Sequence, residues 1–257
     1  MNLNLNLIRL VCVLSWLLAG VAAAAPLKIY GMDSAPVSFL NHGQADGFVV
    51  ELAAAIQQRL GQRDPIEIVP WARANTVALT EPGVLLLSIV RTREREQTMH
   101  FVGPLFNTWV TAFALKGKAA EWQRDHTDLH KLRAGARRGS VFVSLPVAQG
   151  YNVVDQTNTS VTAAKMLMNQ RFDLWFDGEE LYDDALRRAG YQPSDVEVAF
   201  RLDPMQVYFA FSNGTPAATV QAWDNALGEM KRDGSFLKIY RKWLPAHQLP
   251  ADAAQSH

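Results

Sequence analysis

Short apolar runs alternate with amphipathic stretches along most of the chain. The runs, several of them apolar on both faces as buried strands are, cover residues 27–30, 66–69, 84–90, 110–115, 141–143, 172–176 and 207–211. Between them, residues 47–60, 160–169, 178–189, 217–231 and 235–244 carry patterns typical of helices. This alternation of strands and helices predicts an α/β fold.

The clearest helix covers residues 47–60. Its apolar residues recur at every fourth position from Phe48 to Leu60, which places them on one face. Asp46 is a suitable N-cap, and Gly61 is suited to end the helix.

Two polar stretches predict crossovers between two lobes. The run 110–115 is followed by polar residues 116–118, and the run 207–211 leads into Ser212-Asn213-Gly214. With both as crossovers, residues 26–113 and 208–247 form one lobe, and residues 114–207 form the other. A cleft would then lie between the lobes. Residues 248–257 are a C-terminal tail, polar and expected to be frayed from residue 250 onward.

The first 25 residues have the pattern of a signal peptide. Arg9 is the positive group, residues 10–21 form a short apolar run, and four alanines at 22–25 offer a cleavage site. A membrane anchor is the less favoured alternative, since the run is short for a bilayer. We therefore expect export to the periplasm.

Composition narrows the function further. The 257 residues carry 25 basic and 25 acidic groups without a basic block, which argues against nucleic acid as a partner. The single cysteine, Cys12, lies in the predicted signal peptide, so the mature chain would have no thiol for catalysis or for a metal. His126 and His130 lie four residues apart in a polar stretch, which favours a solvated helix face over a metal site.

Three groups of motifs, in order along the chain, carry a resemblance to a known family. The first is Ala35-Pro36-Val37-Ser38-Phe39, then Gly43 and Asp46-Gly47-Phe48-Val49-Val50-Glu51-Leu52. The second is residues 88–96 (SIVRTRERE) followed by residues 101–105 (FVGPL), and the third is residues 210–212 (AFS) with residues 231–236 (KRDGSF), Tyr240 and Trp243. This ordered set resembles the bacterial extracellular solute-binding proteins of family 3, the periplasmic substrate-binding proteins of polar-amino-acid ABC transporters.

The resemblance implies a two-lobed periplasmic binding protein of type II, with two hinge crossovers. Such a protein closes like a Venus flytrap on a small polar ligand, here an amino acid or a related carboxylate. It then delivers the ligand to an inner-membrane ABC permease. We expect a monomer that needs no cofactor.

The resemblance also implies how the ligand carboxylate is held. Arg95 stands three residues after Thr92, as in the family's T-x-x-R segment, and both are expected at the ligand. A guanidinium suits bidentate binding of a carboxylate. Gly139-Ser140 is similar to the family's G-T/S element, whose hydroxyl and backbone N–H meet the same group. The alternatives are a surface arginine and an ordinary strand entry.

Two aspartates are candidates for the ligand ammonium group. The resemblance implies that Asp177 binds the ammonium group, and its place after the run 172–176 agrees, since ligands bind at the carboxyl ends of parallel strands. It could equally cap a helix beginning near Gly178. Asp33, after the first strand, is either a second ligand contact or a simple turn residue.

Aromatic side chains could hold the apolar part of a ligand. Trp71 lies near the position of the family's stacking aromatic and Phe39 is a second candidate, although a tryptophan after a strand more often belongs to the core. Arg73 and Arg91 are further cations near the expected cleft. If either enters it, the ligand would carry more than one negative charge.

Departures from the family pattern affect specificity and leave an alternative open. Residues 81–87 (EPGVLLL) replace the usual segment before T-x-x-R, Val90 stands where a contacting Ser or Thr is common, and Gly178 follows Asp177. The alternative is a dehydratase-like enzyme with Glu179 or Glu180 as acid or base, but an exposed first helical turn explains these acids better. A sensory module is a third interpretation, disfavoured because no output domain follows Trp243.

Overall fold

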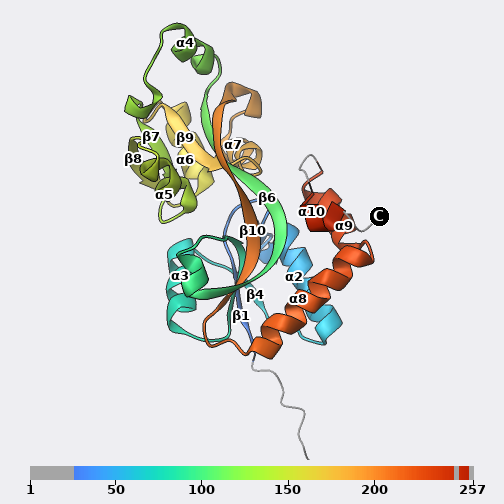
Figure 1. The fold of residues 1–257 in the computed structure, drawn as a ribbon. Helices are drawn as coiled ribbons and strands as arrows, with labels where there is room; N and C mark the ends of the chain where they lie inside the picture. Colours follow the sequence, from blue (N-terminus) through green and yellow to red (C-terminus); the bar gives the residue numbers. More distant parts are fainter. Residues whose placement is uncertain (1–25, 246–248, 255–257) are drawn as a thin grey trace, which may run out of the picture.

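The protein consists of two lobes that share one twisted sheet (Figure 1). The computed structural model describes residues 26–245 and 249–254. Eight strands follow the order β4-β1-β5-β10-β6-β9-β7-β8, so that the sheet runs from one lobe into the other. The α/β, two-lobed fold predicted from the sequence is confirmed. The predicted signal peptide, residues 1–25, lies outside the described residues.

Lobe 1 contains the N-terminal elements and the C-terminal helices. Its strands are β1 (Lys28–Gly31), β4 (Ile66–Ile68) and β5 (Val84–Val90), with a small hairpin of β2 (Phe39–Asn41) and β3 (Gln44–Asp46). Its helices are α2 (Phe48–Leu60), α3 (Trp71–Thr80), α8 (Ala217–Arg232) and α9 (Ser235–Trp243). The strands β1, β4 and β5 are parallel to one another.

Lobe 2 is built from the middle of the chain. Its strands are β7 (Ala134–Arg137), β8 (Val153–Thr157) and β9 (Leu174–Gly178). Its helices are α4 (Lys118–Arg124), α5 (Val141–Ala148), α6 (Ser160–Met168) and α7 (Tyr182–Ala189). Here β7 pairs in parallel with both β8 and β9.

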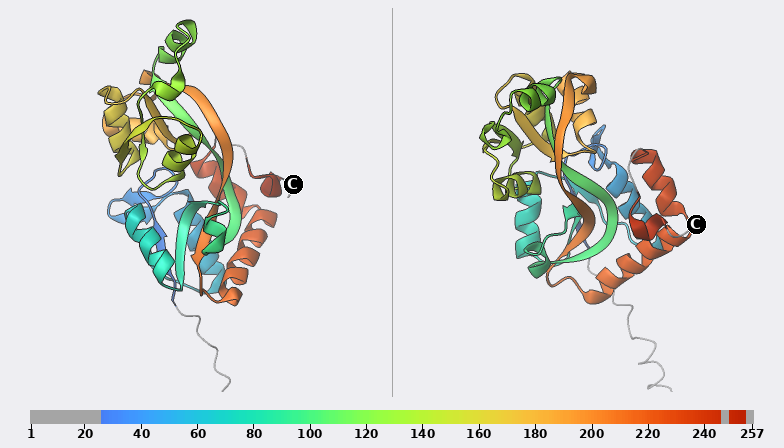
Figure 2. Two further views of the ribbon diagram at one scale, coloured as in Figure 1. Left: turned by 60° about the vertical axis from the view of Figure 1, so that its left-hand side comes forward. Right: turned by 45° about the horizontal axis from the view of Figure 1, so that its top comes forward.

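Two long strands connect the lobes. β6 (Met99–Leu115) and β10 (Val196–Ser212) pair antiparallel along almost their whole length and run from one lobe to the other (Figure 2). In lobe 1 β10 also pairs with β5, and in lobe 2 β6 also pairs with β9. Between these regions, residues 107–109 of β6 pair with residues 204–206 of β10. The predicted lobe boundaries at 113/114 and 207/208 fall on these same strands and stay a prediction.

The helix predicted after Gly47 forms as expected, apart from its cap. α2 covers Phe48–Leu60 and ends at Gly61, whose φ of 67° is the left-handed conformation that glycine adopts without strain. The N-cap is Gly47 rather than Asp46, and it has a φ of 118°. A Cβ at this position would lie 2.7 Å from the carbonyl oxygen of Val37, so the chain needs glycine here.

Two other local predictions are wrong. Residues 141–143 were expected in a strand because of their β-branched pattern, but they begin α5. The chain turns at Gly139, which has a positive φ, and Ser140 becomes the N-cap. The helix expected from residue 178 begins four residues later, at Tyr182, because β9 extends through Gly178.

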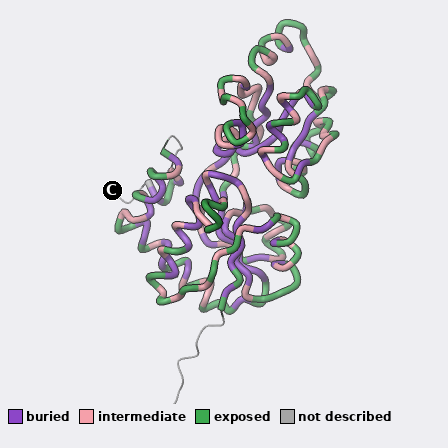
Figure 3. The backbone as a smooth tube through the Cα atoms, turned by 180° about the vertical axis from the view of Figure 1, so that it is seen from behind, coloured by how far each residue is buried: buried purple, intermediate pink, exposed green. Residues whose placement is uncertain are grey.

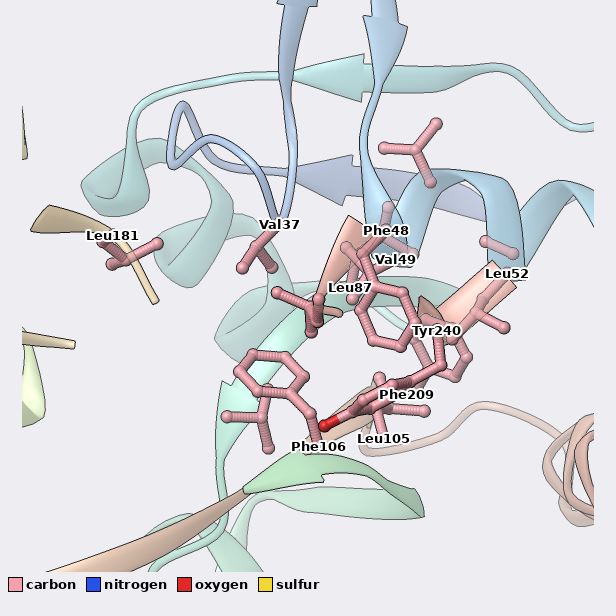
Figure 4. Packing of buried hydrophobic residues seen from close by; sticks show 14 of the residues in the cluster. Val37, Phe48, Val49, Leu52, Leu87, Leu105, Phe106, Leu181, Phe209 and Tyr240 are labelled. Atoms are coloured by element: carbon pink, nitrogen blue, oxygen red, sulfur yellow. The ribbon is translucent and has the colours of Figure 1, made fainter. Parts of the chain in front are cut away.

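The largest core cluster covers one side of the sheet in lobe 1 and continues into lobe 2. Buried residues lie mainly in the interior of each lobe, and exposed residues follow its outer turns (Figure 3). The ring of Phe48 packs edge-on against Phe106 and Tyr240, with centroids 5.8 and 5.4 Å away (Figure 4). It also packs edge-on against Phe236, with a centroid 6.3 Å away. Among the described helices, none combines the length and the apolar character needed to cross a bilayer.

Part of the expected C-terminal tail is helical. Residues 251–254 form the short helix α10, and the fraying of the chain end stays a prediction. Ala253 is buried against the core, and Asp252 forms an ion pair with Lys231 of α8. An apolar contact and a charged contact together hold this segment on lobe 1.

Candidate functional site

A cavity of about 440 Å³ lies between the two lobes. It is lined by the segment after β1, the start of α3, the end of β5, the crossing strands and the start of α5. Most lining residues are apolar. The charged residues among them are Asp33, Arg95, Arg137, Arg138 and Glu180. A concave, largely apolar site with a few polar groups is typical of small-molecule binding.

Arg95 is a cation without an acidic partner inside this cavity. It begins the 3₁₀ turn Arg95–Gln97 just after β5, and its backbone N–H donates to the hydroxyl of Thr92 at 3.3 Å. The guanidinium donates to the carbonyl of Val90 at 2.9 Å and lies 5.3 Å from the centre of the Trp71 ring. None of the carboxylates in the described residues pairs with it, and burial lowers the pKa of Arg95. A ligand anion would therefore be stabilised beside it.

Trp71 and Ser140 lie on opposite lobes and both line the cavity. Trp71 is the first residue of α3, and its indole N–H donates to the carbonyl of Gly139 at 2.9 Å. Ser140 is the N-cap of α5, and its hydroxyl donates to the carbonyl of Arg137 at 2.6 Å. The N-terminus of a helix therefore faces the side of the cavity where Trp71 lies.

Asp177 lies behind the cavity rather than on its surface. It is fully buried in β9 and is not a lining residue. One carboxylate oxygen accepts from the backbone N–H of Gly178 at 2.9 Å and lies 3.3 Å from the guanidinium of Arg137. The interpretation of Asp177 as a helix cap is wrong, since Leu181 is the N-cap of α7. Arg137 lines the cavity, and its guanidinium lies between the cavity and the Asp177 carboxylate.

Asp33 lines the cavity and is held from the opposite lobe. Its two carboxylate oxygens accept from the guanidinium of Arg188 in α7 at 3.0 and 3.1 Å. The carboxylate in turn raises the pKa of Arg188. Beside this pair, Arg137 donates to the hydroxyl of Ser34 at 2.7 Å, again across the two lobes. With the Trp71–Gly139 hydrogen bond, these contacts hold the lobes together around the cavity.

The other predicted residues lie outside the cavity lining. Phe39 packs edge-on against Trp243, with the ring centroids 6.0 Å apart. Thr92 supports the turn of Arg95 from behind. Arg73 is exposed on α3, and Arg91 pairs with Glu96 at 2.6 Å. Neither arginine adds positive charge to the cavity surface.

Glu180 is the cavity residue that sequence reasoning underrated. It was expected on an exposed helical turn, but its side chain is buried and lines the cavity. Its carboxyl accepts a hydrogen bond from the hydroxyl of Thr108 at 2.5 Å, and burial raises its pKa to about 7. The late start of α7 explains the difference, because Glu180 lies in the turn between β9 and that helix. In residues 26–245 and 249–254, no cluster of three or more His, Cys, Asp or Glu could hold a metal ion.

Comparison with known protein families shows which family the chain belongs to. The family model of the bacterial extracellular solute-binding proteins, family 3, matches residues 29–246. The chain belongs to this family. The resemblance stated from the sequence motifs is confirmed. No curated protein matches the chain.

Solved structures similar to this family 3 member include binding proteins and a sensor domain. A histidine kinase sensor domain with similarity to periplasmic binding proteins has 19% identity and a TM-score of 0.77, covering 87% of this chain and 98% of its own. The arginine-, lysine- and histidine-binding protein ArtJ of Geobacillus stearothermophilus has 18% identity and a TM-score of 0.75, covering 89% and 100%. The ancestral amino acid-binding protein AncCDT-1, a precursor of cyclohexadienyl dehydratase, has 20% identity and a TM-score of 0.70, covering 84% and 94%. These likenesses concern the fold.

Proposed function

We propose that this protein captures a small carboxylate ligand in the periplasm and presents it to an inner-membrane ABC permease. Arg95, Ser140 and Trp71 contact the ligand, Asp33 acts at the cavity surface, and Asp177 acts from behind the cavity through Arg137. Membership of a solute-binding family and similarity to amino acid-binding structures support this role. The protein acts as a monomer.

The observation that carries the proposal is the position of Arg95. A partly buried guanidinium without an acidic partner loses hydration that the Val90 carbonyl replaces only in part. A carboxylate bound in the cavity would supply the missing charge, with the start of α5 opposite it.

Ligand binding is expected to favour lobe closure. The cavity is lined from both lobes, so a ligand touches both only when they are together. A ligand that binds the closed form more tightly shifts the population toward it, with motion at the crossing strands. The closed form would then present a composite surface to the permease.

Calorimetry with chemically defined pools tests the proposal. The refolded, ligand-free protein is titrated with pooled L-amino acids, dicarboxylates and small peptides, and the solution is assayed afterwards for chemical change. We expect stoichiometric heat from an intact carboxylate ligand.

Arg95→Ala should weaken binding by about 100-fold, because truncating one partner of a buried charge pair costs about 2–5 kcal/mol. Arg73→Ala, an exposed arginine outside the cavity, is the matched control. Unchanged binding by Arg95→Ala contradicts the proposal.

A second candidate function is a dehydratase-like reaction in the same cavity. Glu180 favours the dehydratase-like function because its side chain is buried and lines the cavity. A carboxyl with a pKa of about 7 can donate or accept a proton at neutral pH. The same titrations decide between the two functions. Consumption of a pool component that stops in Glu180→Gln supports an enzyme, whereas recovery of the intact ligand supports a binding protein.

A further inference from the structure

The carboxylates that could receive a ligand ammonium group are all engaged or withdrawn. A zwitterionic amino acid needs an acidic partner for its ammonium group, because an unpaired buried charge is costly. In the described part of the chain, the acidic groups at this cavity are Asp33 and Glu180, with Asp177 behind it. For each of these three acids, a different feature of the structure prevents pairing with a ligand ammonium group.

Asp177 is covered by a cation. The guanidinium of Arg137 lies 3.3 Å from its carboxylate, donates at 2.7 Å to Ser34, and stacks 5.1 Å from the ring centre of Phe142. These contacts fix the arginine over the aspartate from both lobes. An ammonium group entering the cavity would meet the Arg137 cation before it met the Asp177 carboxylate.

Asp33 and Glu180 are also poor partners for a ligand ammonium group. Both oxygens of Asp33 accept from Arg188. Glu180 accepts from Thr108, and at neutral pH its buried carboxyl is partly protonated, because its pKa is about 7. The nearby carbonyl of Val90 already accepts from Arg95.

The remaining lining favours an apolar anion. Arg95 and Arg138 carry positive charge without an acidic partner among the described residues, and Arg138 lies exposed at the cavity edge. The rest of the surface is largely aliphatic and aromatic. Its aromatic members are Trp71, Phe106 and Phe142, and its aliphatic members include Leu40, Ile68 and Leu181.

We propose that the ligand is a carboxylate with an apolar body and no α-ammonium group, because Arg137 covers Asp177 and Arg188 occupies Asp33. This inference rests on the proposed function and narrows its ligand class. The carboxylate binds at Arg95, and the apolar body fills the space between Trp71 and Phe142.

Matched pairs of probes that differ in the amino group test the inference. The ligand-free protein is titrated at pH 7 with L-phenylalanine and 3-phenylpropionate, and with L-leucine and 4-methylpentanoate. We expect the unaminated member of at least one pair to bind about tenfold tighter or more. Equal or tighter binding of the amino acids overturns the inference but leaves the proposed function standing. Heat from neither pair also overturns it, and the pooled titrations then judge the proposed function separately.

Uncovering Asp177 should reverse the preference. In Arg137→Leu, the ratio of affinities within each pair should move toward the amino acid by about tenfold. The double variant Arg137→Leu with Asp177→Asn should lose this gain, since the uncovered carboxylate is gone. Arg73→Leu, which removes an exposed arginine outside the cavity, is the control for loss of charge. An unchanged ratio in Arg137→Leu contradicts the inference. If that variant does not fold, Arg137→Gln provides the same comparison with a polar side chain.

Discussion

The protonation of Glu180 links the stability of the protein to pH. Its pKa is raised from 4.5 to about 7, chiefly by burial. Between these pH values the unfolded chain has released a proton that the folded protein retains. The free energy of unfolding therefore falls as pH rises from about 4.5 to 7, by up to about 3 kcal/mol. Glu180→Gln should remove this fall, as measured by urea unfolding at pH 5 and pH 8.

Glu179 provides a control for this prediction. It is adjacent in sequence but pairs with Arg201 at the surface, at 2.5 Å. Glu179→Gln should keep the pH dependence of the wild-type protein. The same slope in wild type and in Glu180→Gln would mean that the buried carboxyl does not retain its proton.

Among the residues that line the cavity, Arg95 was expected there from the sequence and Glu180 was not. Arg95 was predicted from its match to the family's T-x-x-R segment, and the structure places it in the cavity. Glu180 was assigned to an exposed turn, and the cover over Asp177 was not foreseen. A family motif identifies a residue that stands in a recognisable segment of the sequence. It does not reveal a contact between β7 and β9, which depends on tertiary packing.

Among the elements, β7 is the strand that presents Arg137 to the cavity, and its position depends on Gly135. A Cβ on this glycine would lie 2.1 Å from the ring of Phe172, which is buried. The ring cannot move without displacing the core of lobe 2. Gly135→Ala should therefore lower the free energy of unfolding by about 1–3 kcal/mol, measured by urea unfolding.

A double variant shows whether this steric contact is the cause. Phe172→Leu makes room beside β7, so Gly135→Ala should cost less in the Phe172→Leu background than in wild type. Additive losses would mean that the glycine matters for another reason.

The elements also differ in how well the sequence predicted them. α2 was foreseen because its apolar periodicity and its terminal Gly61 agree. α5 was missed because Val141 and Val143 have the β-branched character of strands, whereas the turn at Gly139 and the capping position of Ser140 start a helix. Strand propensity is a weak guide when a tertiary contact, such as the Trp71–Gly139 hydrogen bond, fixes a turn.

The whole molecule combines a continuous sheet with an interlobe cavity. β6 and β10 are the strands that cross between the lobes, so a change of lobe angle must bend this pair. The hydrogen bonds from Asp33, Ser34 and Trp71 to lobe 2 oppose an opening of the lobes. The two polar crossover stretches and the family motifs both predicted two lobes, but nothing in the sequence paired Asp33 with Arg188, 155 positions away.

The Asp33–Arg188 pair should therefore tune the equilibrium between open and closed forms. Both side chains are partly exposed, and such a pair contributes up to about 1 kcal/mol. Arg188→Gln should shift the ligand-free population toward the open form and weaken ligand binding by up to about fivefold. Small-angle scattering would record a larger radius of gyration. Arg187→Gln is the matched control, because Arg187 pairs with Asp183 within α7 and does not cross the lobes. Equal effects of the two variants would show that the pair does not stabilise closure.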